Sequence, residues 1–173
     1  MSRVLMIVAQ VGFRDEELLI PKTILERAGH IVSVASHTRA RAVGVKGASV
    51  APDLAFHEVN PTFFDMVVVV GGSGSYSLGD DQEVKRILVG ASASGKILGA
   101  ICVCPLALAK AGVVGNKNAT CFDDNQVISM LRGGGATFVD KPLVVDDKLV
   151  TADGPQSAME FGNALVQILK GGK

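Results

Sequence analysis

The feature that most constrains the fold is a regular alternation between short apolar runs and segments with helical spacing. Residues 4–9 and 66–70 consist almost entirely of valine, isoleucine, leucine and methionine, which is typical of strands buried on both faces. Residues 16–28 carry apolar side chains at intervals of three and four, which predicts a helix that ends at Gly29. Strands that alternate with helices form parallel β-α-β units, so we expect an α/β fold with a mostly parallel sheet covered on both faces.

The same patterns predict the other elements of this fold. Further strands are expected at residues 31–35, 43–50, 96–101 and 118–121, and two late strands are expected to turn around Asp146 and Asp147. Further helices are expected at residues 82–93, 105–111 and 125–131, and from near Pro155 to just before Gly171. No linker, repeat or low-complexity segment divides the chain, so residues 1–173 are expected to form one domain.

Charge and composition limit the partners and the cellular setting. The chain has 17 Lys and Arg against 17 Asp and Glu, and this balance argues against nucleic acid or an anionic membrane, which both select a basic excess. The longest apolar stretch, residues 97–109, is too short to cross a bilayer, and the N-terminus lacks a signal-peptide pattern. Three cysteines are an odd number for a disulfide framework. We therefore expect a cytoplasmic protein in a reducing compartment.

The clearest chemical signal lies in residues 99–105, where a buried strand ends and a helix begins after a short turn that contains Cys102. A nucleophile in such a turn projects from the edge of the sheet, as in a nucleophile elbow. The N-terminus of the following helix places partial positive charge near the sulfur, which predicts a lowered thiol pKa. The alternative interpretation is a buried cysteine that acts as a small apolar side chain.

Two more strand ends carry candidate groups. Glycines and serines at residues 71–75 allow backbone N–H groups to approach a ligand, and with the amide of Val103 they can form an oxyanion hole. A phosphate cradle is the competing interpretation, although the lysine of a nucleotide-binding loop is missing. The acidic residues Asp15, Glu16 and Glu17 begin a predicted helix, where carboxylates often only complement the helix dipole.

Taken together and in this order, these segments resemble the ThiJ/PfpI superfamily, most closely the branch that contains the parkinsonism-associated protein deglycase. The resemblance runs over essentially the whole chain. It implies a flavodoxin-like three-layer sandwich with a nucleophile-elbow cysteine, no metal or organic cofactor, and a homodimer. The motifs that carry it are DEELLIP at 15–21, ERAG at 26–29, VVVVGG at 67–72, AIC with a later proline at 100–105, LVTADGP at 149–155 and EF at 160–161.

The resemblance assigns roles to four positions of the candidate site. Cys102 stands where the family has its reactive cysteine, and Glu17 stands where it has a carboxylate hydrogen-bonded to that sulfur. A carboxyl group buried beside a thiolate has a raised pKa and can remain protonated. Gly72 and Val103 match the backbone donors of the family.

The chain departs from the protease-named branch, which places a histidine directly after the cysteine. Val103 occupies that position here, which favours the deglycase branch. The histidines, His30, His37 and His57, fall outside the predicted catalytic loops. Without a Cys-His pair we do not expect proteolysis.

Four further positions receive weaker assignments. Cys121 falls at a loop position that commonly holds His or Tyr, and if that loop covers the site its sulfur can resolve an oxidised Cys102 as a disulfide. Cys104 replaces a frequent glycine and is interpreted as a small packed side chain. Arg27 and Lys46 fall where family members often have basic residues near the dimer interface.

Two functions of different kinds are expected, the first from the resemblance and the second from the elbow cysteine with two further cysteines nearby in the sequence. One is an enzyme that converts a 2-oxoaldehyde such as methylglyoxal to a hydroxy acid, or removes early glycation adducts from protein side chains. The other is a redox sensor or redox chaperone in which Cys102 is oxidised to a sulfinate and partners respond to the change. Nucleotide binding through residues 71–75 is a third reading, and it has the least support.

Overall fold

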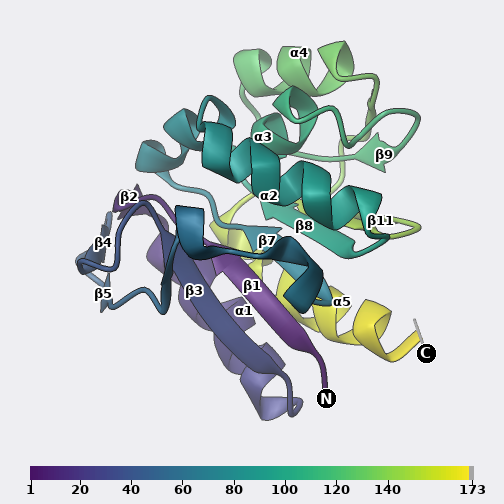
Figure 1. The fold of residues 1–173 in the computed structure, drawn as a ribbon. Helices are drawn as coiled ribbons and strands as arrows, with labels where there is room; N and C mark the ends of the chain where they lie inside the picture. Colours follow the sequence, from purple (N-terminus) through teal and green to yellow (C-terminus); the bar gives the residue numbers. More distant parts are fainter. Residues whose placement is uncertain (172–173) are drawn as a thin grey trace.

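The computed structural model describes residues 1–171, and at its centre is a sheet with the strand order β11-β12-β8-β7-β1-β3-β6 (Figure 1). Neighbouring strands in this sheet are parallel, except that β11 and β12 form an antiparallel hairpin. The predicted mostly parallel sheet and the late strand pair are therefore confirmed. The strands are β1 (Arg3–Ile7), β3 (Ile31–Ser36), β6 (Leu54–Ala55), β7 (Met66–Val69), β8 (Ile97–Ile101), β11 (Leu143–Asp146) and β12 (Leu149–Ala152).

Helices cover both faces of the sheet and complete the expected three-layer sandwich. Helices α1 and α5 pack against each other on one face, α2 and α3 lie on the other, and α4 packs against α3 (Figure 1). The helices are α1 (Asp15–Arg27), α2 (Gln82–Ala93), α3 (Pro105–Lys110), α4 (Asn125–Gly133) and α5 (Ala158–Gly171). Within the described residues, no helix is long and apolar enough to span a membrane.

Helix α2 shows how the sequence pattern produces these layers. The Asp81 side chain accepts hydrogen bonds from the amides of Glu83 and Val84, which satisfies two free N–H groups of the first turn. The apolar residues at helical spacing, Val84, Ile87, Leu88 and Ala91, are all fully buried against the sheet. The cap and this apolar face are both visible in the sequence, which is why the predicted range of residues 82–93 is confirmed.

The strand predicted at residues 43–50 is wrong as a single element. The chain forms two short antiparallel strands there, β4 (Ala42–Gly44) and β5 (Ser49–Val50), and β2 (Val11–Phe13) pairs with β4 in a separate small sheet. The buried Asp15 carboxylate accepts hydrogen bonds from the backbone amides of Lys46 and Ala48, at 2.9 and 2.7 Å. Because a carboxylate that is distant in the sequence holds this turn, the sequence of residues 43–50 does not show that the strand is interrupted.

Other boundaries differ by a few residues. Strand β9 (Asn118–Ala119) stops before Cys121 and pairs with β10 (Thr137–Phe138). The last helix continues through Gly171 instead of ending before it, and its first turn is a separate 3-10 turn. The 3-10 turns are η1 (Phe56–Glu58), η2 (Pro61–Phe63), η3 (Ser73–Gly79) and η4 (Pro155–Ser157).

The loops that follow β1, β7, β8 and β12 meet at the carboxyl edge of the sheet. The amide of Arg14 donates to the carbonyl of Gly71 at 2.7 Å, which joins the segments after β1 and β7. The amide of Cys102 donates to the carbonyl of Ala152 at 2.9 Å, which joins β8 to β12. This edge is where ligands bind in open α/β sheets.

Candidate active site

Cys102 lies between the end of β8 and the start of α3 in a left-handed backbone conformation, with φ at 64°. A residue with a Cβ atom adopts this conformation at a cost of roughly 1–3 kcal/mol, and such strain often marks functional turns. The carbonyl of Cys102 accepts a hydrogen bond from the amide of Phe122 at 2.8 Å. The turn is therefore held from both sides, by β12 at its amide and by Phe122 at its carbonyl.

Cys102 lines a cavity of about 500 Å³ together with three other predicted site residues, Glu17, Gly72 and Val103. Segments far apart in the sequence thus bring the four groups to one place. The cavity is also lined by Arg14, Val45, Ser73, Tyr76, Phe122, Pro155 and Gln156.

Glu17 is fully buried in the first turn of α1, against the Cys102 thiol and the Gly71 amide. Neither contact is aligned as a full hydrogen bond, so both carboxyl oxygens lack a well-aligned partner among the described residues. Burial raises the pKa of Glu17 to about 7, although the interactions with Cys102 and Gly71 act in the opposite direction. The group therefore exchanges a proton near neutral pH.

The predicted lowering of the thiol pKa is wrong. Burial, together with the charge of Glu17, raises the pKa of Cys102 to about 12, while the amides of Val103 and Gly72 act to lower it. Helix α3 has only six residues, so its terminal charge does not outweigh burial beside an acid. Because the two groups are in contact, they titrate as a pair whose first proton leaves near pH 7.

Glycine at position 71 makes the contact between Glu17 and Cys102 sterically feasible. A Cβ atom there would lie 2.6 Å from the Cys102 Cβ and would clash with the Glu17 carboxyl. Gly72 follows with φ at 129°, close to the backbone of Arg14. A Cβ atom on Gly74 would meet the Val11 carbonyl, so this part of the loop packs closely on β2. The phosphate cradle considered above stays an untested alternative.

The other two acidic residues of the segment have different partners. The Asp15 carboxylate holds the turn between β4 and β5, and Glu16 forms ion pairs with Arg14 and Lys46. Only Glu17 of the three lines the cavity. Its neighbours serve the local structure around it.

Comparison with known proteins identifies the family. The family model described as DJ-1/PfpI matches residues 2–168, nearly the whole chain. This chain belongs to the DJ-1/PfpI family. The resemblance expected from the sequence is thereby confirmed.

Relatives and solved structures agree with this assignment. The glutathione-independent glyoxalase DJR-1.2 of Caenorhabditis elegans is 30% identical over 155 residues, covering 90% of this chain and 82% of that protein. The deglycase TK1284 of Thermococcus kodakarensis is 31% identical over 169 residues, covering 95% and 98%. The crystal structure of a ThiJ/PfpI domain protein from Brachyspira murdochii superposes with a TM-score of 0.94, at 33% identity, covering 99% and 98%.

The other two cysteines of this DJ-1/PfpI domain do not line the cavity. Cys121 is buried, and burial raises the pKa of its thiol to about 12; its neighbour Phe122 reaches the cavity instead. The thiol of Cys104 donates to the carbonyl of Val70 at 3.1 Å, in keeping with a packed side chain. The resolving role of Cys121 stays a prediction.

Sequence reasoning missed three polar residues of the cavity, Arg14, Tyr76 and Gln156. Arg14 directly precedes α1, and Tyr76, the only tyrosine of the chain, lies in η3. The Tyr76 hydroxyl donates to Asp124 at 2.9 Å, and burial together with this carboxylate raises its pKa to about 12. The position of the chain's single tyrosine in a glycine- and serine-rich loop was the sequence signal that could have marked Tyr76 as a site residue.

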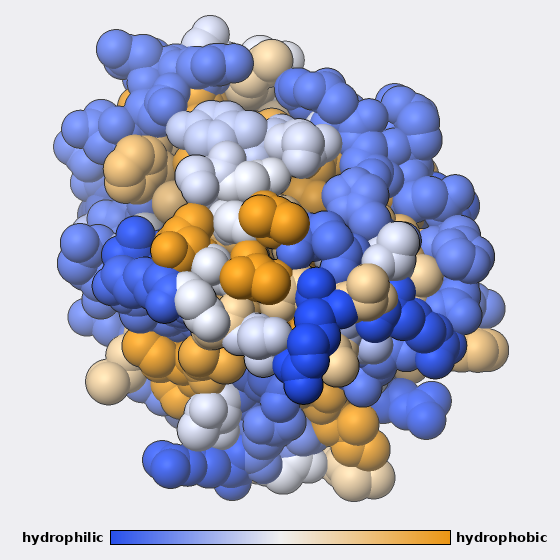
Figure 2. Space-filling model, turned by 90° about the vertical axis from the view of Figure 1, so that its left-hand side faces the viewer, coloured by the Kyte–Doolittle hydropathy of each residue, from blue (hydrophilic) through white to orange (hydrophobic). Residues whose placement is uncertain are grey.

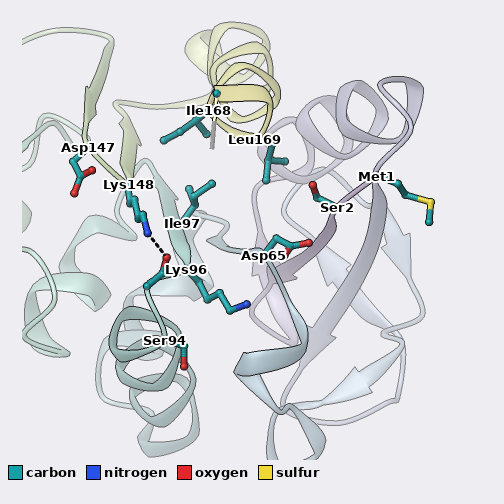
Figure 3. A pocket seen from close by; sticks show the side chains of 12 residues that line it. Met1, Ser2, Asp65, Ser94, Lys96, Ile97, Asp147, Lys148, Ile168 and Leu169 are labelled. Atoms are coloured by element: carbon teal, nitrogen blue, oxygen red, sulfur yellow. Dashed lines mark hydrogen bonds between the residues drawn. The ribbon is translucent and has the colours of Figure 1, made fainter. Parts of the chain in front are cut away.

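A second cavity, of about 570 Å³, lies at the opposite end of the sheet, where β1, β7 and β8 begin (Figure 3). The described residues that line it include no cysteine or histidine, and the Lys148 ammonium donates to the carbonyl of Gly95 at 2.7 Å. No histidine among the described residues lines the Cys102 cavity either, as the sequence predicted. Within residues 1–171, no group of His, Cys, Asp or Glu is placed to hold a metal ion.

Proposed function

We propose that this protein is a cofactor-independent cysteine enzyme that converts 2-oxoaldehydes to 2-hydroxy acids, for example methylglyoxal to lactate. The observation that carries the proposal is the convergence of four groups on one cavity. The Cys102 thiol, the Glu17 carboxyl and the amides of Gly72 and Val103 all interact around one sulfur. The same first step applies to early glycation adducts of protein side chains.

The first step joins the substrate to the cysteine. With one proton on the pair, the Cys102 sulfur attacks the aldehyde carbon and forms a C–S bond, and the carbonyl oxygen becomes an oxyanion. The amides of Gly72 and Val103 donate to this oxygen, and Glu17 delivers the proton that completes the hemithioacetal. The protein needs no other reactant for this step.

The later steps move a proton between carbons and add water. The Glu17 carboxylate removes the proton from C1, which gives an enediol. Return of a proton to C2 then converts this enediol to a thioester. Water then hydrolyses the thioester, which releases lactate and regenerates the thiol. The balance is one methylglyoxal and one water for one lactic acid.

The names of the relatives support this proposal. One is named a glutathione-independent glyoxalase and others are named deglycases, at about 30% identity over most of the chain. Both names describe chemistry on reactive carbonyl compounds or their adducts.

The proposal is tested by following methylglyoxal loss and lactate formation together. We expect Cys102→Ser to lower kcat/KM at least about a thousandfold, because the nucleophile is lost. Cys121→Ala is the matched control, since Cys121 is buried but does not line the cavity, and it should stay near wild type. Absence of turnover in the wild type, or full turnover in Cys102→Ser, would reject the proposal.

A second candidate function is oxidative sensing at the same cysteine. Cys102 reaches the cavity while Cys104 and Cys121 do not, so peroxide should oxidise it first. Two hydrogen peroxide molecules convert the thiol to a sulfinic acid and release two waters. Peptide mass spectrometry after mild peroxide should show two added oxygens at Cys102 alone. Equal oxidation of the three cysteines would exclude a sensor, and a disulfide from Cys102 to Cys121 would establish the resolving role.

We also propose that the protein is a cytoplasmic homodimer. All three cysteines are free thiols, which fits a reducing compartment. Val11 and Val43 are paired in the small sheet and remain 71% and 41% exposed. Figure 2 shows this side of the molecule, where hydrophobic residues lie among hydrophilic ones. An exposed apolar face beside the site is suited to a second copy of the chain.

A further inference from the structure

Arg14 has a place in the cavity that the proposed chemistry does not use. It lines the same space as Cys102, and its amide is bound to the carbonyl of Gly71 in the neighbouring loop. Among residues 1–171, Glu17 is the only other charged residue in that lining. A guanidinium group at this position therefore sets the charge that an incoming molecule meets.

The Arg14 guanidinium is held on one edge and free on another. Its Nε donates to Glu16 at 2.8 Å and its Nη2 makes a longer contact of 3.5 Å to the other oxygen of that carboxylate. Within the described part of the chain, Nη1 donates to no protein group. The side chain is 33% exposed, so its free N–H groups remain accessible to a ligand.

Arg14 shares its carboxylate partner with a second cation. Glu16 is shared by two cations, because the Lys46 ammonium also contacts its carboxylate. The hydrogen bond from Lys46, together with that from Arg14, lowers the pKa of Glu16 to about 2, so it is ionised at neutral pH. Because one carboxylate is shared by two cations, Glu16 is not a full counter-ion for the Arg14 guanidinium.

Two other acids of this region, Asp15 and Asp124, have partners of their own. The Asp15 carboxylate accepts from the amides of Lys46 and Ala48. Asp124 does not line the cavity; its carboxylate accepts from the Tyr76 hydroxyl and from the first amides of α4. Arg14 is thus the one lining side chain that carries a positive charge, and it faces the same space as the reactive sulfur.

We propose that Arg14 makes this site selective for aldehydes that carry a phosphate group, a substrate class that rests on the proposed reaction of Cys102 with aldehydes. A guanidinium group binds phosphate through parallel N–H bonds, and a cavity of about 500 Å³ holds a three-carbon chain with a phosphate at its far end. The sulfur adds to the aldehyde carbon, the carbonyl electron pair moves to the oxygen, and this oxygen takes the proton of the pair.

The test compares two aldehydes that differ only in the phosphate, glyceraldehyde and glyceraldehyde 3-phosphate. Covalent addition of either aldehyde to the Cys102 sulfur blocks alkylation of this sulfur by iodoacetamide. Mass spectrometry of the Cys102 peptide measures the extent of alkylation, and no turnover is required. In the wild type we expect half-protection at a concentration at least about tenfold lower for the phosphorylated aldehyde, as one charged hydrogen-bond pair supplies that factor.

Variants assign the preference to Arg14. Arg14→Gln should remove the difference between the two aldehydes. Arg39→Gln is the matched control, because it makes the same substitution at an exposed arginine that pairs with Glu58 and does not line the cavity, and it should keep the preference. Circular dichroism melts confirm that each variant is folded.

The outcomes separate this proposal from the enzyme proposal. Equal protection by the two aldehydes in the wild type, or a preference that survives in Arg14→Gln, overturns phosphate recognition while hemithioacetal formation stands. If neither aldehyde slows alkylation in the wild type, phosphate recognition and the hemithioacetal step are both rejected.

Discussion

At the scale of single residues, the proposed reaction depends on one proton shared by Glu17 and Cys102. Glu17 is the only acid of its segment inside the cavity, and burial shifts its titration to about pH 7. The sequence allowed this residue and Cys102 to be predicted, since a strand-turn-helix pattern and separated family motifs mark both. The direction of the thiol pKa was not predictable, because burial depends on contacts between distant segments.

Glu17 should make folding stability depend on pH. Its folded-state pKa of about 7 lies above the ordinary glutamate value of 4.5, so the unfolded chain releases the proton first as the pH rises. Stability should therefore fall between about pH 4.5 and 7, by an amount on the order of 3 kcal/mol. In Glu17→Gln this loss should be absent, which urea unfolding at pH 5 and pH 8 measures. Identical pH dependence in the two proteins would contradict the assignment.

The same pair should set the pH profile of activity. Attack needs one proton on the pair, and the first proton leaves near pH 7 while the second stays until about pH 12. We expect kcat/KM for methylglyoxal to rise between about pH 6 and 8 and then level off. Rates measured at constant ionic strength test this, and a flat profile across that range would count against a shared proton.

At the scale of elements, two turns at the sheet edge build the site. Helix α2 was predictable because its cap and apolar face are both local. The β4–β5 turn was not, because a carboxylate from α1 holds it. Arg14 and Tyr76 were missed for a related reason, since polar residues in loops normally face solvent.

Replacing Gly71 should disable the site without unfolding the sheet. A Cβ atom at Gly71 would press on the Cys102 Cβ and the Glu17 carboxyl, so Gly71→Ala should lower kcat/KM at least about a hundredfold. Gly133→Ala is the control, since nothing lies within 4 Å of a Cβ there. Equal activity of both variants, with similar melting temperatures, would show that this close approach is unimportant.

At the scale of the whole molecule, the small sheet formed by β2, β4 and β5 gives the domain an apolar face next to its cavity. We expect Val11→Asp and Val43→Asp to dissociate the proposed dimer, because each places a charge on that face. Val145→Asp is the control, as Val145 is 51% exposed on the opposite edge strand β11. Sedimentation velocity measures the change, and a monomeric wild type would refute the dimer.

We propose that Cys102 and Glu17 act as one unit, and a double-mutant cycle on methylglyoxal turnover shows whether they do. Groups that act together show losses that do not add. We expect Glu17→Gln alone to lower kcat/KM at least about a hundredfold. Adding Glu17→Gln to Cys102→Ser should cost nothing further. Losses that multiply in the double variant, or full activity in either single one, would contradict the account.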